Sequence, residues 1–319
     1  VVDSRDKRTE FTPQFVKDAG AKGFMNKGKW SPYSDDPVFQ KYYTKFVKAL
    51  AKDFNDPSKV EFIDGFGLGK WGEYHTMIYS TGDDTPKKAV FDWVTDIYSQ
   101  AFDKVPVVIN YHRWIGAGKD WVDDEHFAAD SEEMLEGAIK KGYSLRHDAF
   151  GMTTYYGSWE RRFAKKYRNI CPIIMEGGWI VKSHSYWQDP RGYRKDSHED
   201  VRRGEFDDSK EAHVNMMDFR FGDTESWFKD AFDLVRRFLR EGGYRLYPSE
   251  ISLPLEVSKK TTPTIKHCWN NLGWGYCPTN IPQWNQKYKV AFALLDSETN
   301  EVRYTFVDTD TDLSKWIKG

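Results

Sequence analysis

Two glutamates stand out because each follows a short apolar run and has aromatic residues and glycines around it. Glu73 lies in the segment Trp71-Gly72-Glu73-Tyr74-His75, after the strand-like run 60–67. Glu176 lies in the segment Ile173-Ile174-Met175-Glu176-Gly177-Gly178-Trp179, roughly a hundred residues later. Two carboxylates at the C-terminal ends of two strands in one α/β chain are the groups that most glycoside hydrolases use. The sequence therefore predicts chemistry on a glycosidic bond.

That chemistry needs one carboxylate to attack the sugar and one carboxylic acid to protonate the leaving oxygen, about 5–5.5 Å apart in a retaining enzyme. We expect Glu176 to be the nucleophile, held in its ionised form by Arg220 near the end of the last predicted barrel strand. We expect Glu73 to be the acid, because burial against Trp71 and Tyr74 would raise its pKa.

Other polar and aromatic residues at predicted strand ends are candidates for binding the sugar. A tyrosine after the sixth predicted strand would donate a hydrogen bond to the nucleophile, and tryptophans would stack on sugar rings. Each candidate also has a structural reading: the histidines as hydrogen-bonded core residues, the arginine as an ion-pair partner, the tryptophan as core. The candidates are Trp71, His75, Asn110, His112, Arg113, Tyr155, Tyr156, Trp179 and Arg220.

Strand and helix patterns alternate along the first three quarters of the chain. Short apolar runs bounded by turn residues predict buried strands at 1–4, 60–66, 105–111, 148–154, 172–176 and 214–219. Helices are predicted to start at Asp36-Pro37, Thr85-Pro86 and Ser131, and a fourth to cover 225–240 before Gly242-Gly243. This alternation predicts an α/β fold, a (β/α)8 TIM-type barrel.

Two of these helices show a predicted inward face. In the first, Phe39, Tyr42, Phe46 and Leu50 recur at helical spacing, and in the fourth so do Phe228, Phe232, Val235 and Leu239.

After Gly243 the pattern changes to short β-rich runs at 251–257, 264–269, 289–295 and 302–307, with a hairpin loop at 296–301. We therefore expect a barrel domain over 1–243 and a β-sandwich domain over 244–319. Six predicted strands are too few for a closed barrel, and 76 residues (319 − 243) are short for a sandwich. We expect the barrel to be incomplete at its N-terminus, the sandwich to be truncated, and the missing part of the same chain to be a partner.

Composition narrows the possible partners. The charge is nearly balanced, with 47 basic and 49 acidic residues, so neither nucleic acid nor an anionic membrane surface is favoured, and no apolar run is long enough to span a membrane. The 13 Trp, 18 Tyr and 21 Phe suit a carbohydrate protein or a large aromatic core equally. No motif predicts a metal or a cofactor. Cys268 and Cys277 are spaced so that they could pair across a hairpin.

Four segments carry a resemblance to a known group of proteins. They are Asp3-Ser4-Arg5, Trp71-Gly72-Glu73-Tyr74-His75, Arg146-His147-Asp148-Ala149-Phe150-Gly151 and Met175-Glu176-Gly177-Gly178. The chain resembles uncharacterised bacterial proteins with a β-galactosidase-like barrel and a β-sandwich, related to the large clan of retaining glycoside hydrolases. The resemblance implies that Glu73 follows barrel strand 4 and Glu176 strand 7, with two strands between them. The clan usually has Asn before the acid, where this chain has Gly72.

Three functions are compatible with these patterns. The first is a retaining glycoside hydrolase acting on a polysaccharide or its oligosaccharides, which would imply a secreted, periplasmic or cell-surface location. The second is a non-catalytic sugar-binding barrel, which Gly72 favours. The third is a structural surface protein in which barrel and sandwich act as a spacer. The separation of the two carboxylates distinguishes the first from the others.

Overall fold

The computed structural model describes residues 10–26, 28–119, 125–151, 155–177, 198–219, 226–258 and 260–318. The strand predicted at 1–4, and the candidates Trp179 and Arg220, lie outside these residues.

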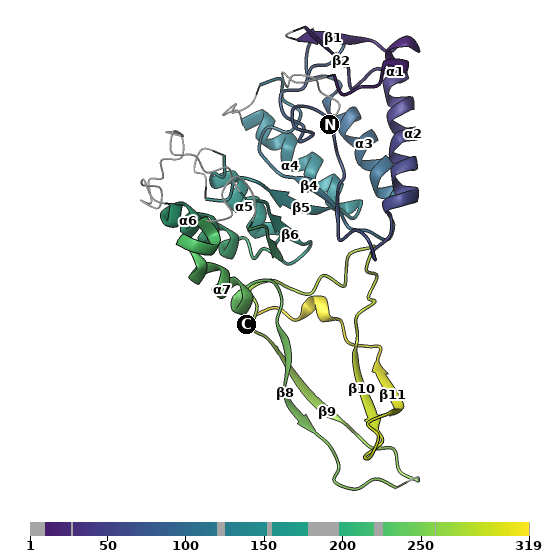
Figure 1. Ribbon diagram of the computed structural model, residues 1–319, viewed down its shortest axis with the longest axis vertical. Coiled ribbons are helices and arrows are strands. Elements are labelled where there is room, and N and C mark those ends of the chain that lie inside the picture. Colours follow the sequence, from purple (N-terminus) through teal and green to yellow (C-terminus); the bar gives the residue numbers. More distant parts are fainter. Residues whose placement is uncertain are drawn as a thin grey trace.

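A five-stranded parallel sheet forms the centre of the molecule (Figure 1). Its strands follow the order of the chain without exception: β3 (Ile63–Asp64), β4 (Val107–Asn110), β5 (Ser144–His147), β6 (Ile173–Met175) and β7 (Met216–Met217). The crossovers contain α3 (Lys87–Ala101), α4 (Glu125–Lys140), α5 (Ser158–Tyr167) and α6 (His198–Glu211). Because right-handed crossovers between successive neighbours all fall on the same side, the helices cover one face of the sheet.

A (β/α)8 barrel has a strand order and crossovers of this kind, but so does an open parallel sheet. Within the described residues the sheet has five parallel strands and does not close on itself, so the complete barrel stays a prediction. The predicted strands at 60–66, 105–111, 172–176 and 214–219 each contain an observed strand. The prediction at 148–154 is displaced, because β5 ends at His147 and Asp148 follows it.

The two faces of the sheet differ in character. Val107, Ile109, Leu145 and Ile173 belong to the main hydrophobic core under the helices. Side chains alternate between faces along a strand, so Asp64, Asn110 and Arg146 lie on the opposite, inner face. A helix-covered sheet thus presents polar groups on the side that a barrel would enclose.

Helix α2 (Pro37–Phe54) begins as predicted, with Asp36 as its N-cap accepting a hydrogen bond from Phe39 N at 2.8 Å. Its buried residues are Phe39, Tyr43 and Val47, whereas Phe46 is 54% exposed. The predicted inward face was therefore wrong at Phe46, because two overlapping apolar stripes run along this helix and α3 packs against only one of them.

Two other helices differ from their predictions, α4 in where it begins and α7 (Phe232–Glu241) in which face it buries. Helix α4 begins six residues before the predicted Ser131, and α7 stops before Gly242 as predicted. A short π-helical turn, Ser226–Asp230, precedes α7. In α7 the buried residues are Leu234, Val235 and Phe238, while three of the four predicted inward residues are exposed: Phe228, Phe232 and Leu239.

A small N-terminal layer precedes the sheet. It consists of α1 (Gln14–Asp18) and a hairpin of β1 (Gly23–Asn26) and β2 (Lys29–Pro32), and α1 contacts α2. None of these elements was predicted.

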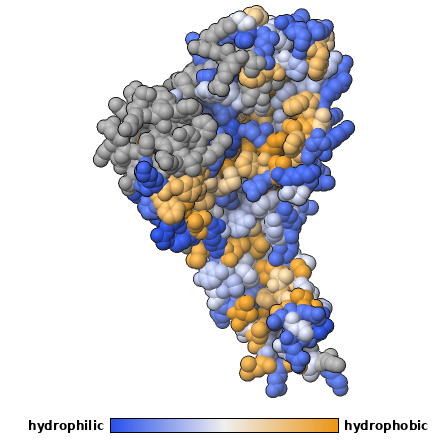
Figure 2. Space-filling view, in the orientation of Figure 1, coloured by the Kyte–Doolittle hydropathy of each residue, from blue (hydrophilic) through white to orange (hydrophobic). Residues whose placement is uncertain are grey.

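The last part of the chain forms two antiparallel pairs that extend away from the parallel sheet (Figure 1). One pairs β8 (Leu246–Ser252) with β9 (Lys266–Asn271), and the other pairs β10 (Val290–Leu295) with β11 (Val302–Asp308), joined by the predicted loop. A 3-10 turn, Leu313–Lys315, follows. Figure 2 shows apolar residues on the surface of these ribbons. The change from α/β to antiparallel structure falls between Glu241 and Leu246, and the sandwich stays a prediction.

The segment between β9 and β10 packs under the N-terminal ends of the parallel strands. Trp274 Nε1 donates to the carbonyl of Val214 at 2.9 Å, and Asn215 Nδ2 donates to the carbonyl of Tyr276 at 2.8 Å. Cys268 is exposed and Cys277 is buried, and both are free, so the pairing considered from their spacing does not form. In the part of the chain that the structure describes, we found no helix with both the length and the apolar character of a membrane span.

Candidate active site

The C-terminal edge of the sheet holds both predicted catalytic glutamates. Glu73 lies in the loop after β3, and Glu176 directly follows β6. Arg146 in β5 joins them: its Nη2 donates to Glu73 Oε1 at 2.7 Å, and its Nη1 donates to Glu176 Oε2 at 2.6 Å. The two carboxylates are therefore no farther apart than one guanidinium and its hydrogen bonds can reach. The two strands expected between them, β4 and β5, are present.

Arg146 also binds a third carboxylate, since its Nε donates to Asp64 Oδ2 at 2.5 Å. The guanidinium thus contacts Asp64, Glu73 and Glu176, which we call the Arg146 cluster. Arg146 and Glu73 have side chains 9% exposed, and that of Glu176 is 30% exposed. Charge-assisted bonds in such a poorly hydrated place are strong, and they leave the cluster with more negative than positive groups.

The loop that carries Glu73 has an unusual backbone. Trp71, Tyr74 and Thr76 have positive φ angles of 61°, 62° and 45°. Such angles cost a non-glycine residue about 1–2 kcal/mol. The loop is held by backbone bonds, among them Lys70 N to His75 O at 2.9 Å and Tyr74 N to Leu68 O at 2.9 Å. Strain that surrounding structure maintains is common at functional sites.

A glycine makes this loop possible. Gly69 has a φ of 75°, and a Cβ there would lie 2.8 Å from the carbonyl oxygen of His75. Any larger residue would push the two sides of the loop apart and displace Glu73.

Burial and neighbouring charges raise the pKa values of two carboxyl groups at this edge, those of Glu73 and Asp148. Burial raises the pKa of Glu73 above its ordinary value, Arg146 acts against this, and the negative charge of Glu176 adds to it. Burial, and then Glu73, raise the pKa of Asp148 to about 6, although 40% of this side chain is exposed. A glutamate with a raised pKa is suited to act as a general acid.

Two predicted histidines stack beside Glu73. The rings of His75 and His112 are parallel, 4.2 Å apart, and both are buried. Trp114 Nε1 donates to His75 Nδ1, so the hydrogen of a neutral His75 is on Nε2, which lies 3.6 Å from Glu73 Oε2. His112 Nε2 donates to the backbone carbonyl of Glu73 at 3.0 Å. Burial lowers the pKa of His112 well below its ordinary value, so this ring is neutral.

The other predicted sugar-binding residues lie in different parts of the structure. Trp71 is 55% exposed at the rim of the site, with Lys70 Nζ 3.8 Å from its ring centroid. Asn110 is on the inner face beside Arg146, with which it pairs in register. Tyr155 is half-buried and packs with Ala149 and Val201.

Tyr156 lies on the helix-covered side of the sheet, in the main hydrophobic core. Its hydroxyl is 2.9 Å from that of Tyr111, in an aromatic layer with His147 and Phe150. Tyr155 or Tyr156 was expected to donate a hydrogen bond to Glu176. Among the contacts of the described residues Tyr156 makes no such bond, because its side chain points into the core.

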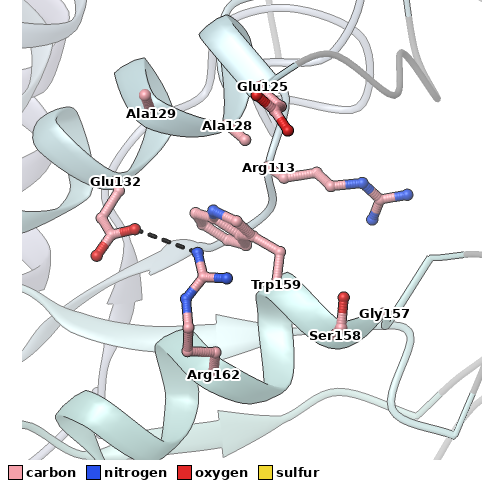
Figure 3. Close-up of a pocket in the computed structure, with 9 residues that line it drawn as sticks. All are labelled: Arg113, Glu125, Ala128, Ala129, Glu132, Gly157, Ser158, Trp159 and Arg162. Atoms are coloured by element: carbon pink, nitrogen blue, oxygen red, sulfur yellow. Dashed lines mark hydrogen bonds and ion pairs between the residues drawn. The ribbon is translucent and has the colours of Figure 1, made fainter.

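Arg113 supports a helix and lines a separate pocket. Its Nη1 lies 3.0 Å from Glu160 Oε1, and Glu160 also accepts from Gly157 N at the start of α5. The pocket of about 580 Å³ between α4 and α5, shown in Figure 3, has Arg113, Trp159 and Arg162 in its wall. Its described lining includes neither catalytic candidate and no residue of the Arg146 cluster, so the pocket is a separate feature.

Sequence reasoning missed Arg146 as a site residue. It expected Arg220, which lies outside the described residues, to keep Glu176 ionised. Because this strand was predicted at 148–154, Arg146 fell before its start and away from the barrel mouth, whereas β5 spans Ser144–His147.

Among the described residues one group has metal-ligand geometry, Asp84, His126 and Asp130. The ammonium of Lys87 already lies 2.8 Å from Asp84 and 2.7 Å from Asp130. A second ammonium, that of Lys88, lies 3.0 Å from Asp130, so two lysines balance the two carboxylates and the group is best understood as an ion-pair cluster.

Comparison of the chain with protein-family models, with curated proteins and with solved structures found no match.

Proposed function

We propose that this protein is a retaining glycoside hydrolase acting on a polysaccharide or its oligosaccharides, with Glu176 as nucleophile and Glu73 as acid and base. The observation that carries the proposal is the shared guanidinium of Arg146, which keeps two carboxylates from different strand ends within one cluster. Their separation is compatible with the short spacing that double displacement requires. The strand order supports the further proposal that the fold is a barrel of this enzyme class.

The environments of the two glutamates support different roles. Glu176 is the more exposed and has a direct ion pair with Arg146, which favours the ionised form that a nucleophile needs. Glu73 is more buried and has a raised pKa, which favours the protonated form of an acid. After the first step Glu73 would be a carboxylate, and it would then act as base on the incoming water. No cofactor is needed for this chemistry, and a secreted, periplasmic or cell-surface location follows if the substrate is a polysaccharide.

Hydrolysis of aryl glycosides by two variants tests the assignment. Glu176→Gln keeps shape but removes the nucleophile's charge, and we expect turnover to be abolished while sugar binding is largely kept. Glu73→Ala should form the glycosyl-enzyme intermediate from an activated aryl glycoside and then stall, and azide should restore turnover because it needs no base. Glu250→Gln, an exposed glutamate in β8, is the matched control. Wild-type turnover by Glu73→Ala on all substrates would remove Glu73 from the mechanism.

A second function, non-catalytic sugar binding, is favoured by two observations. Gly72 stands where the resembling clan usually has an asparagine. Arg146 binds both carboxylates and so stabilises the ionised form of Glu73, which works against its role as an acid. Sugar binding by the wild-type protein, combined with an absence of turnover on every aryl glycoside tested, would support this function.

A further inference from the structure

Register across the sheet places a row of polar side chains on the inner face. Asn110 pairs with Arg146, and Asp64 lies one row nearer the N-terminal edge, opposite Val108. Paired residues of neighbouring parallel strands point to the same side. Asn110 therefore points to the same side of the sheet as Arg146, which binds three carboxylates there.

Two buried acceptors at this edge have no partner within the described residues. Asn110 is 3% exposed, and its Oδ1 accepts no hydrogen bond. His112 is 1% exposed, and its Nδ1 is also unpartnered. Since His112 Nε2 donates its hydrogen to the carbonyl of Glu73, the neutral ring has only a lone pair at Nδ1. A buried acceptor without a donor is costly, so each is a place where a ligand hydrogen bond would be gained.

The charges around these acceptors are predominantly negative. Asp64, Glu73 and Glu176 share the single guanidinium of Arg146. Asp148 adds a fourth carboxyl, since it directly follows β5 in the position where Glu176 follows β6. The groups that would contact a ligand are thus mostly hydrogen-bond acceptors. The strongest donor, the guanidinium of Arg146, is already bound to carboxylates. An anionic sugar would be repelled here, whereas a ligand rich in donors and carrying positive charge would be attracted.

We propose that the sugar bound at this site carries a free, protonated amino group, as in the amino-sugar units of a polysaccharide without N-acetyl groups. The ammonium supplies three donors and a positive charge, which match the carboxylates of the Arg146 cluster and the acceptors Asn110 Oδ1 and His112 Nδ1. This substrate class rests on the proposed glycoside hydrolase function.

Calorimetric binding of four matched β-1,4-linked tetrasaccharides tests the substrate class. They consist of glucosamine, N-acetylglucosamine, glucose and glucuronate units. We expect the glucosamine tetramer to bind about tenfold or more tightly than the glucose tetramer, with affinity falling as salt is added, and the glucuronate tetramer to bind most weakly. Equal or tighter binding of the N-acetylated or neutral tetramer would overturn the proposal.

A charge variant gives a second, independent readout. Asp148→Asn keeps the shape of the side chain, so we expect it to lower the preference for the amine over the neutral tetramer severalfold, and Asp148→Glu to restore it. Asp310→Asn, an exposed aspartate after β11, is the matched control and should change nothing. An unchanged preference in Asp148→Asn would count against the charge argument.

The two proposals fail in different ways. Hydrolysis of neutral aryl glycosides without a preference for amines would overturn the substrate class and leave the hydrolase. Failure to bind any of the four tetramers would overturn the substrate class, and an absence of turnover on every aryl glycoside tested would in addition overturn the hydrolase.

Discussion

The two ends of the parallel sheet use polar groups in opposite ways. At the N-terminal end, side chains from the segment after β9 satisfy backbone carbonyls and pack aromatic rings, as Trp274 does against Phe206 and Phe238. At the C-terminal end, three carboxylates share the single guanidinium of Arg146. The first arrangement stabilises the fold, whereas the second is costly unless something binds there. This difference supports placing the proposed site at the end where the strands terminate.

The largest effect should come from Arg146, where stability and function depend on the same side chain. Arg146→Met would leave three carboxylates together without a counter-charge, and we expect a loss of about 3–5 kcal/mol in the free energy of unfolding. Urea denaturation measures the loss. Arg303→Met is the matched control, since this arginine pairs with Asp296 and Glu301 but is 58% exposed, and it should change stability by at most about 1 kcal/mol. Equal effects of the two variants would show that the Arg146 cluster is no more than a surface ion pair.

A change at the N-terminal end of the sheet should lower stability without changing sugar affinity. Trp274→Ala removes a buried ring and the donor to Val214, so we expect a loss of about 3–5 kcal/mol in the free energy of unfolding. The fraction that is folded should retain wild-type sugar affinity. Denaturation and calorimetry on the same sample check both points. If Trp274→Phe, which keeps most of the ring, also weakens sugar binding, the two ends are coupled.

The histidines near the site should make stability depend on pH. Burial holds the pKa of His112 and His147 well below the ordinary value, so between that value and the folded pKa the unfolded state binds more protons. Stability is then fully present above about pH 6.5 and falls as the pH drops below it. Glu73 and Asp148, with raised pKa values, act in the opposite direction and should flatten the fall below about pH 6.

Urea titrations at several pH values measure the slope of the free energy of unfolding against pH. His112→Gln should reduce it, whereas His126→Gln, on a side chain 74% exposed, should leave it unchanged. A slope that is the same in all three proteins would mean that folding does not lower the pKa of His112.

The smallest expected effect concerns backbone strain in the loop that carries Glu73. Trp71→Gly relieves a positive φ but adds freedom to the unfolded chain, so stability should change by less than about 1 kcal/mol. Sugar binding should still weaken, because the exposed ring is lost. Asn300→Gly, at a φ of 57° in the loop between β10 and β11, is the matched control and should leave binding unchanged. Calorimetry that shows equal affinity for both variants would exclude Trp71 as a sugar contact.

The sequence by itself determined features that depend on neighbouring residues. Asp36 as an N-cap, the end of α7 before Gly242 and the loop between β10 and β11 were all predicted. The placement of Glu176 directly after one strand, and of two strands between it and Glu73, was predicted for the same reason, although Glu73 lies in the loop beyond β3 and not at the strand end itself. Each is encoded by residues a few positions apart, so no knowledge of the fold was needed.

Only the tertiary structure decided which partners these residues meet. Arg146 binds Asp64, Glu73 and Glu176, which are 82, 73 and 30 residues away in the chain. Tyr156 points into the core, and Phe46 and Phe228 point outward, although their spacing suited other roles. These outcomes depend on the register between strands and on which face of each helix packs against another element. Contacts between residues so far apart in sequence are set by packing, which local patterns do not specify.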